Sequence, residues 1–555
     1  MRPNLAVASL LILLLGVPMV GAFAAALSAG LDVSAWLALA SDSQFLNAAR
    51  MTLWTGTVSS LLAAAITAHL LSSVFPGPAW SRAVRLLGPL LAVPHVAFAI
   101  GLVVLISPSG WLLRAVSPWA TGFTAPPGWI TTQDPWGLGL IAVLIFKEVP
   151  FLLWAAATQL QRGDASQRLA RELDVARSLG YTPRKAWWRV VWPQLCPRLR
   201  WPMLAVLGYS LTVVDVAMVI GPTSPPTLAV LAWQWLQDAD LAQNAQGAAA
   251  AWVLALLVAL VASLLWMTPK WPLWRARWTS GVRGRHLNAK PRRPSTLAPA
   301  GMTALIAVYL AVMAALLLGS ISGVWAFPEL LPQTFTTDAW ASVGRSAESV
   351  GTTLTLALSS AAAGLIWSIA WLEFAPPRWD DLLRKTIYLP LVLPSILWVV
   401  GLHRLTVHWG LDATWSGVWL AHCLATLPYV LIALSPAYLG FDARYWAVSA
   451  SLGRSRWQFL LRVKWPLLRA SLSAAAAVGF AVSVAQYLPT LFIGAGRYST
   501  ITTEAVALAS GAQRSLSSAY AALQWLLPVV GFGLAAWIGQ PRRFSRLADG
   551  ATRSE

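Results

Sequence analysis

Two stretches of this chain repeat one pattern, and together they decide the fold. The first, Asp174 to Pro193, reads DVARSLGYTPRKAWWRVVWP, and the second, Ala447 to Pro466, reads AVSASLGRSRWQFLLRVKWP. In each copy a Leu-Gly pair is followed by Arg nine positions after the Gly and by Pro thirteen positions after it. The copies start at positions 174 and 447 of 555 residues, which indicates an internal duplication.

Each copy is predicted to form two short helices on either side of its Gly. Thr182 is an N-cap residue followed by Pro183 at the first helical position, and Ser455 has the right character to cap the second helix of the other copy. Each copy follows one apolar segment and precedes another. We therefore expect each to be a polar loop between two membrane spans.

These loops resemble the EAA loop of the permeases of binding-protein-dependent (type I) ABC importers. That loop has a short acidic start followed by Ala, then a Gly and, further on, a Pro. The matching positions, with the Arg that both copies share, are Asp174, Ala176, Leu179, Gly180, Arg189, Pro193, Leu452, Gly453, Arg462 and Pro466. Ala447 stands at the acidic place of the second copy. The stretch from Ser210 to Leu236 is also similar to the thiamine- and iron-type branch of fused permeases.

The resemblance implies an all-α, polytopic membrane protein made of two tandem six-helix permease units (MetI-like). It also implies two partners: a periplasmic solute-binding protein outside, and a separate ATPase subunit, in two copies, inside. The ten matching positions would be the coupling residues that contact the ATPase. No cofactor is expected, and the substrate stays open among thiamine-like cations, ferric iron and small organic solutes.

Composition independently places the chain in a membrane. Of the 555 residues 57% are hydrophobic and only 11% are charged, whereas a soluble domain has roughly 25% charged residues. Apolar runs long enough to span a bilayer occur near residues 5–27, 51–75, 86–106, 138–160, 203–220, 248–267, 302–323, 351–372, 387–407, 417–439, 472–493 and 519–538. The sequence thus predicts six spans in each half.

The spans divide the chain into four parts. Residues 1–268 are expected to form the first permease unit, with a coupling loop at about 162–200, and residues 301–540 the second, with a loop at about 440–469. Residues 269–300 form a basic cytoplasmic linker expected to contact anionic membrane lipid, and residues 541–555 a cytoplasmic tail.

The distribution of basic residues predicts the orientation in a bacterial inner membrane. With both termini in the cytoplasm, 33 of the 40 Lys and Arg residues fall on the cytoplasmic side, in agreement with the positive-inside rule. The net charge of +19 is therefore explained by the membrane and does not indicate a nucleic-acid partner.

The chain lacks the motifs of an enzyme. A P-loop needs Gly-Lys-Ser/Thr, and none of the six lysines follows a Gly. No H-E-x-x-H, G-x-S-x-G or C-x-x-C motif is present either, so neither catalysis nor a bound metal is predicted. Any ATP-driven motor must therefore lie on another polypeptide.

Polar residues inside the predicted spans are candidates for the translocation pathway, because a central charge costs about 2.5–3.5 kcal/mol on insertion scales. The candidates are Lys147, Glu148, Asp215, His422 and Gln486. The alternative is a buried structural network, for instance one that pairs Lys147 with Asp215. A lone His among apolar residues is usually a satisfied structural residue, which favours that alternative for His422.

Two other classes of membrane protein fit part of the pattern. A secondary transporter of the major facilitator type also has twelve spans and a basic central loop. It would need a Gly-x-x-x-Asp-Arg type motif between spans two and three, where this chain has PGPAWSRAVR without an acidic residue. A structural or insertase-type protein would not co-purify with an ATPase. The paired Gly…Pro loops favour the ABC permease.

Overall fold

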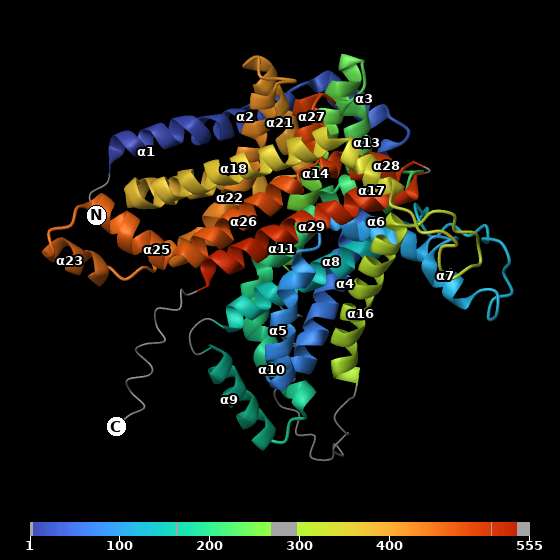
Figure 1. Ribbon diagram of the computed structural model, residues 1–555, viewed down its shortest axis with the longest axis horizontal. Coiled ribbons are helices and arrows are strands. Elements are labelled where there is room, and N and C mark those ends of the chain that lie inside the picture. The colour runs from blue at the N-terminus through green and yellow to red at the C-terminus, as the bar shows by residue number, and fades with distance from the viewer. Residues whose placement is uncertain (1–3, 162–164, 268–296, 512, 541–555) are drawn as a thin grey trace.

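The structure is a computed structural model that describes residues 4–161, 165–267, 297–511 and 513–540 (Figure 1). In these ranges the regular structure is helical apart from two isolated β-bridges, which confirms the all-α prediction. The predicted cytoplasmic tail and all but the last four residues of the predicted linker lie outside the described residues.

Nine helices in the described ranges are long and apolar enough to cross a membrane. They are Leu5–Ala29, Phe45–Val74, His95–Val116, Leu138–Leu160, Leu241–Met267, Ala300–Ser320, Ala347–Phe374, Trp415–Leu439 and Arg514–Gly539. A tenth is reached if the bent pair Arg456–Leu467 and Arg469–Val484 counts as one span. The chain is therefore a polytopic membrane protein with nine to ten candidate spans.

The two halves follow a similar order of elements. The first half contains α1 (Leu5–Leu11), η1 (Ile12–Gly16), α2 (Val17–Ala29), α3 (Val33–Ser41), α4 (Phe45–Val74), α5 (Pro78–Leu91), α6 (His95–Ile106), α7 (Trp111–Val116), α8 (Leu138–Leu160), α9 (Ala165–Ser178), α10 (Pro183–Leu195), η2 (Cys196–Leu199), α11 (Arg200–Thr212), α12 (Asp215–Ile220), α13 (Leu228–Leu236) and α14 (Leu241–Met267).

The second half contains α16 (Leu297–Ser320), α17 (Asp338–Arg345), α18 (Ala347–Phe374), α19 (Pro377–Ile387), α20 (Leu389–Val392), α21 (Ser395–His408), α22 (Trp415–Leu439), α23 (Arg444–Ser451), α24 (Arg456–Phe459), η5 (Leu460–Lys464), α25 (Trp465–Leu467), α26 (Arg469–Val484), α27 (Leu488–Gly494), α28 (Ile501–Ala509) and α29 (Arg514–Gly539). In both halves the long central helices, α4 with α8 and α18 with α22, pack side by side.

Some predicted spans are broken helices, at matching places in the two halves. The predicted spans 86–106 and 387–407 are interrupted before Pro94 and Pro394, where α6 and α21 begin. The residue before a Pro disfavours helical backbone, which explains both breaks. The predicted span 203–220 divides into α11 and α12 with extended backbone at Val213.

The first spanning helix of each half packs against the other half. Helix α2 lies along α21, and α16 lies along α6. Gly401 of α21 and Gly101 of α6 make this possible: a Cβ on Gly401 would overlap the Ala22 carbonyl oxygen in α2, and one on Gly101 would come 2.7 Å from the Val312 carbonyl oxygen in α16. The two halves are therefore interlocked.

A pair of matching hydrogen bonds occurs at equivalent places within the two halves. In the first half the backbone N–H of Leu228 donates to Oγ1 of Thr52 over 2.7 Å. In the second half the backbone N–H of Ile501 donates to Oγ1 of Thr353 over 2.9 Å. All four groups are buried, and each bond ties the start of a short helix to the long central helix.

Contacts at the helix ends place both ends of the described chain near the second repeated loop. The backbone N–H of Asn4 donates to the carbonyl oxygen of Phe374, at the end of α18. Gly539, at the end of α29, lies against Ala470 near the start of α26. Figure 1 shows α9 at the bottom and α23 at the left, with α3 and α7 away from both.

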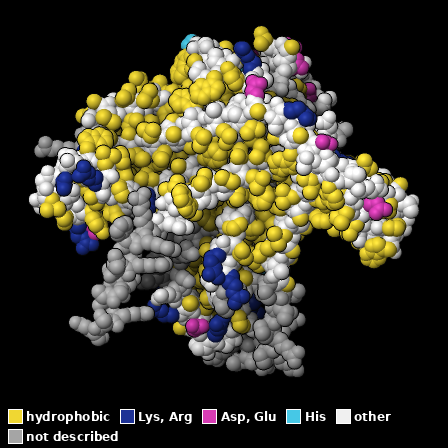
Figure 2. Space-filling model, viewed as in Figure 1, with side chains coloured by type: hydrophobic (Ala, Val, Ile, Leu, Met, Phe, Trp, Pro, Cys, Tyr) yellow, Lys and Arg dark blue, Asp and Glu magenta, His cyan; other side chains and the backbone are white. Residues whose placement is uncertain are grey.

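The molecular surface agrees with a protein that lies in a bilayer. Figure 2 shows hydrophobic side chains over the middle of the visible face, and Lys and Arg gathered at its left end and in its lower part. These two places correspond to the regions of α23 and of α5 and α9 in Figure 1. On this face the basic side chains thus lie mainly near the two repeated loops and α5, with others at its upper edge.

Candidate functional site

The first repeated loop is a helix, a left-handed turn and a second helix, as predicted. Helix α9 ends at Ser178, and Gly180 has a φ of +88°. The N–H of Gly180 donates to the Arg177 carbonyl (2.9 Å), and the N–H of Tyr181 donates to the Ala176 carbonyl (3.2 Å). The long backward bond beside a left-handed Gly is the Schellman type of helix end.

The second loop repeats this geometry. Gly453 has a φ of +70°, its N–H donates to the Ala450 carbonyl (3.0 Å), and the N–H of Arg454 donates to the Ser449 carbonyl (3.1 Å). Ser455 caps α24 through a capping box with Gln458, which confirms the predicted cap.

Thr182 precedes Pro183 as predicted, but its hydroxyl makes no capping hydrogen bond. A Cβ atom on Gly180 or Gly453 would have no neighbour within 4 Å. The two glycines therefore serve the left-handed backbone and not a close approach to another element.

Both loops present the same pair of apolar side chains to the outside. Val175 and Leu179 are 59% and 73% exposed, and the equivalent Val448 and Leu452 are 60% and 72% exposed. Large apolar side chains exposed at identical places of two copies indicate a surface that a partner covers. Val175 and Val448 were not predicted as coupling residues, although Val stands at this position in both aligned copies.

The other predicted coupling residues occupy different environments. Asp174 is exposed and pairs with Arg177 over 3.3 Å, whereas Ala176 is buried against the protein with Leu169 and Leu173. Arg189 and Arg462 are both exposed. Asp174 and the two arginines thus lie on the exposed surface of the loops, and Ala176 belongs to the packed face of α9.

The two repeated prolines lie shortly before the chain turns toward the next helix. Pro193 lies inside α10, which continues to Leu195, and Pro466 lies in the first turn of α25. The chain turns after them, in η2 and at a 76° bend between Leu467 and Arg469. Pro466 lies two residues before Leu468, where the helix bends; a Pro removes a backbone donor and so weakens the helix there.

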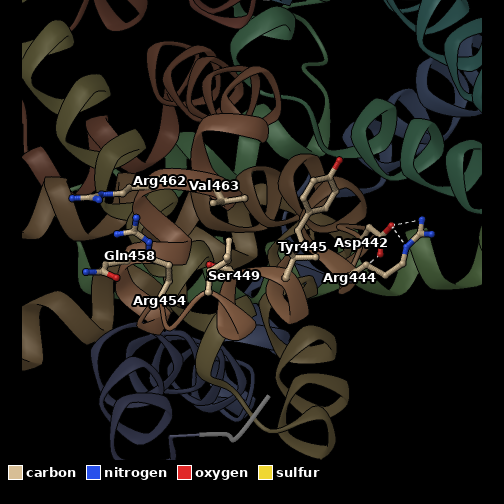
Figure 3. A pocket seen from close by; sticks show the side chains of 10 residues that line it. Asp442, Arg444, Tyr445, Ser449, Arg454, Gln458, Arg462 and Val463 are labelled. Carbon is tan, nitrogen blue, oxygen red and sulfur yellow. Dashed lines mark hydrogen bonds and ion pairs between the residues drawn. The ribbon is translucent and has the colours of Figure 1, made fainter.

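The second loop borders an open hollow of about 670 Å³ (Figure 3). Its lining comes from both helices of the loop and from the turn before α23: Asp442, Arg444, Tyr445, Val448, Ser449, Leu452, Arg454, Gln458, Arg462 and Val463. Asp442 accepts from Nε of Arg444 over 2.7 Å, and these hydrogen bonds lower the pKa of the Asp442 carboxyl. The hollow is a shallow surface depression, lined by both polar and apolar side chains, on the exposed loop.

Lys147 is buried but does not form the predicted pair with Asp215. Its Nζ donates to the carbonyl oxygens of Val93 (2.6 Å) and Leu90 (3.4 Å), at the break between α5 and α6. Its ammonium also lies 5.6 Å from the ring centroid of Tyr309 in α16, a helix of the other half. Backbone carbonyl groups at the helix break therefore bind the Lys147 ammonium, in place of the Asp215 carboxylate suggested by the sequence.

Glu148 and Asp215 both lie near His95 and Tyr209. Nε2 of His95 lies 3.3 Å from Oε1 of Glu148, and the His95 ring lies 4.8 Å from the Tyr209 ring. Asp215, at the start of α12, is within electrostatic range of His95, Tyr209 and Tyr487. His95, Tyr209 and Tyr487 were not singled out from the sequence, because none stands out among neighbouring apolar or aromatic residues.

The polar candidates of the second half have local roles. His422 is buried, with Nδ1 2.7 Å from Oγ of Ser483 and Nε2 2.9 Å from Oγ1 of Thr490. Both ring nitrogens are therefore satisfied, as the structural alternative anticipated. Gln486 follows the end of α26, and its Nε2 donates to the Val482 carbonyl (3.1 Å) in the last turn of that helix.

Comparisons with known proteins fit this geometry. No protein-family model matches the chain. The inner membrane ABC transporter permease protein YnjC of Escherichia coli is 35% identical over 533 residues, which are 95% of each chain. The thiamine transport system permease protein ThiP of Brucella suis is 28% identical over 22% of this chain and 26% of its own. The molybdenum transport system permease protein ModB of Azotobacter vinelandii is 28% identical over 31% of this chain and 83% of its own.

The similarity to YnjC extends over almost the whole of both chains, and it coincides with the duplicated loops and the apolar helices described above. Permease subunits of ABC transporters form the membrane passage and leave ATP hydrolysis to other subunits. This chain therefore belongs to the ABC transporter permeases: it is a multi-pass inner-membrane transport subunit and not an enzyme.

Proposed function

We propose that the chain is the fused transmembrane subunit of a binding-protein-dependent importer, driven by a separate ATPase through the two repeated loops. The observation that carries this proposal is the equivalence of the loops. Each has a Schellman turn at Gly180 or Gly453, followed by a second helix, and each exposes a Val and a Leu at the same places. Two identical docking points on one chain fit two copies of one ATPase subunit.

The proposed topology is six spans in residues 1–268 and six in residues 301–540. The segments beyond the nine to ten candidate spans are the interrupted helices α11–α12 and α20–α21. Helices broken inside a membrane are tolerated where they are buried in protein or line a passage. The matching breaks in the two halves support counting each interrupted pair as one span.

Both termini and both coupling loops are proposed to face the cytoplasm. The Asn4–Phe374 and Gly539–Ala470 contacts support this, because they bring both ends of the described chain to the base of the second loop. The start of α16 lies beside the end of α4, where Gly301 contacts Leu70. The opposite side of the molecule would receive the solute-binding protein.

The proposed pathway runs between the halves, past Glu148, Asp215 and their aromatic neighbours. Tyr209 of α11 is within electrostatic range of Asp215, Glu148 and Tyr429, and Tyr429 belongs to α22 of the second half. A passage formed by two unequal halves suits an asymmetric solute. The names of the relatives include both thiamine and molybdenum, so they do not select one substrate.

Photocrosslinking tests the docking role of the loops. A photoreactive amino acid is placed at Leu179 or at Leu452, and the chain is expressed with its ATPase partner. Trp201 and Ile366, which are 68% and 67% exposed away from the loop tips, are the matched controls. We expect the ATPase to be captured from both loop positions and from neither control. Capture from the controls alone would contradict the proposal.

A further inference from the structure

A buried ionic cluster lies at the base of the second coupling loop. Nζ of Lys464 donates to Oε2 of Glu373 over 2.8 Å, and Nη2 of Arg456 lies 2.9 Å from Oε1 of the same carboxylate. The hydroxyl of Tyr438 also donates to Oε2 over 2.9 Å. The Glu373 and Lys464 side chains are 1% and 4% exposed, so the carboxylate is enclosed by its partners.

The cluster connects three elements. Glu373 belongs to the last turn of α18, Tyr438 to the last turn of α22, and Arg456 and Lys464 to α24 and η5 of the loop. Nη2 of Arg456 also donates to the main-chain carbonyl of Glu373 (2.8 Å), and the Lys464 ammonium lies 3.8 Å from the centroid of the Tyr438 ring. One carboxylate thus holds the second helix of the loop to two spans.

The first half has no charge at the equivalent positions. When the halves are aligned on Thr52 and Thr353, which make matching hydrogen bonds, Ser72 is the equivalent of Glu373. When the loops are aligned on Gly180 and Gly453, Pro183 is the equivalent of Arg456, and Val191 is the equivalent of Lys464.

Instead of ions, the first loop has tryptophans. Trp187 is buried, and its ring centroid lies 5.2 Å from that of Trp188 and 6.0 Å from that of Trp192. Val191, which replaces Lys464, is also fully buried. The two loops share their exposed face but are attached to the membrane helices by different chemistry.

We propose that Glu373 is the positioning residue of the second coupling loop, through which displacement of this loop is transmitted to α18 and α22. The proposal rests on the coupling function proposed above. It also explains why the second loop can have Ala447 at the acidic place: the carboxylate that holds this loop is Glu373 of α18. Asp174, exposed on α9, cannot have the same role in the first loop.

A double variant that removes both the negative charge of Glu373 and the positive charge of Lys464 distinguishes this role from a general contribution to folding. Glu373→Gln alone leaves Arg456 and the deeply buried Lys464 without their carboxylate partner, and it is expected to lower the yield of folded protein. Glu373→Gln with Lys464→Met removes the buried charge on both sides and is expected to restore folding. The exposed Glu348, at the other end of α18, provides the matched control Glu348→Gln.

The decisive quantity is solute uptake per ATP hydrolysed, in vesicles that contain the chain, its ATPase and its binding protein. For the folded double variant we expect this ratio to fall on the order of tenfold, with ATPase co-purification unchanged, because the linked charges act as a unit. Glu348→Gln should leave the ratio unchanged. A double variant with the normal ratio would overturn the role of Glu373.

Distances between spin labels provide a second readout. Labels at Val448 and Ile366, in a chain with Cys196 and Cys423 replaced, report on the loop relative to α18. The distribution should stay narrow through the ATP cycle in the otherwise unaltered chain and broaden in the double variant. Labels at Val175 and Leu61 report on the first loop and should not respond. If the Val448–Ile366 distance distribution of the double variant is unchanged while Leu452 still crosslinks to the ATPase, this inference alone is refuted. If the chain without the double substitution does not crosslink to the ATPase at Leu452, the proposed function is refuted.

Discussion

Gly401 of α21 lies directly against the main chain of Ala22 in α2, with no room for a Cβ atom between them. Its counterpart Gly101 of α6 lies in the same way against Val312 of α16. In each pair one residue belongs to the first half and the other to the second. Each half therefore uses its first span to hold the other half, and the fusion joins units that are already interlocked.

A side chain at this crossing should destabilise the folded protein. Gly401→Leu must push α2 away from α21, and overpacking of this kind costs about 1–3 kcal/mol. We expect a lower midpoint of thermal unfolding in detergent. Gly533→Leu is the control, because a Cβ at Gly533 has no neighbour within 4 Å. Equal midpoints for the two variants would show that the crossing is not a tight contact.

His422 is expected to stabilise α22 against its neighbours and not to bind solute. His422→Leu leaves the hydroxyls of Ser483 and Thr490 without their shared partner, at a cost of about 1–3 kcal/mol. Thermal unfolding should therefore occur at a lower temperature, while the concentration of solute at half-maximal uptake stays unchanged. A variant of normal stability with altered solute dependence would assign His422 to the pathway.

Double-mutant cycles should distinguish the real intramembrane pair from the one inferred from sequence. His95 and Glu148 are 3.3 Å apart, so His95→Gln and Glu148→Gln should show a coupling energy of at least about 0.5 kcal/mol in unfolding experiments. Lys147 is bound by backbone carbonyls, so Lys147→Met and Asp215→Asn should be additive. Coupling between Lys147 and Asp215 with additivity at His95 and Glu148 would contradict the geometry.

Asp174→Ala should reduce transport only slightly. The side chain is exposed and its pair with Arg177 is a surface ion pair, which contributes roughly 0–1 kcal/mol. The second loop already has Ala447 at this place. Uptake by vesicles should remain within about twofold of the unaltered chain. Complete loss of uptake would mean that Asp174 makes an indispensable contact with the ATPase.

The helix–turn–helix geometry of the two repeated loops could be predicted from the sequence because it is local. Gly180 and Gly453 stand where a helix ends, and a left-handed residue at that place needs only its neighbours in the chain. These features repeat in two copies, and the repetition itself removed the ambiguity of a single short motif.

Long-range contacts were not predictable in the same way. Hydropathy shows that residues 86–106 are apolar, but not that the helix breaks before Pro94 and frees carbonyl groups for Lys147. Glu373 also appeared only as the end of an apolar span. Its partners Arg456 and Lys464 are more than eighty positions away, and a charge count cannot indicate which basic residue of a loop turns inward.

The central claim is that the two loops convert ATPase motion into transport, and the two glycines test it with the least disturbance. A β-branched residue in left-handed backbone costs roughly 1–2 kcal/mol, whereas Asn adopts this conformation more readily. Because a Cβ at Gly180 or Gly453 has no neighbour within 4 Å, substitutions there affect the turn and not the packing of the spans.

The measurement is ATP-driven solute uptake by vesicles containing the ATPase, the binding protein and either of two double variants, at equal amounts of inserted chain. We predict that Gly180→Val with Gly453→Val abolishes uptake, while Gly180→Asn with Gly453→Asn retains most of it. Normal uptake by the Val double variant would contradict the account, because the loops would then transmit nothing that depends on their shape.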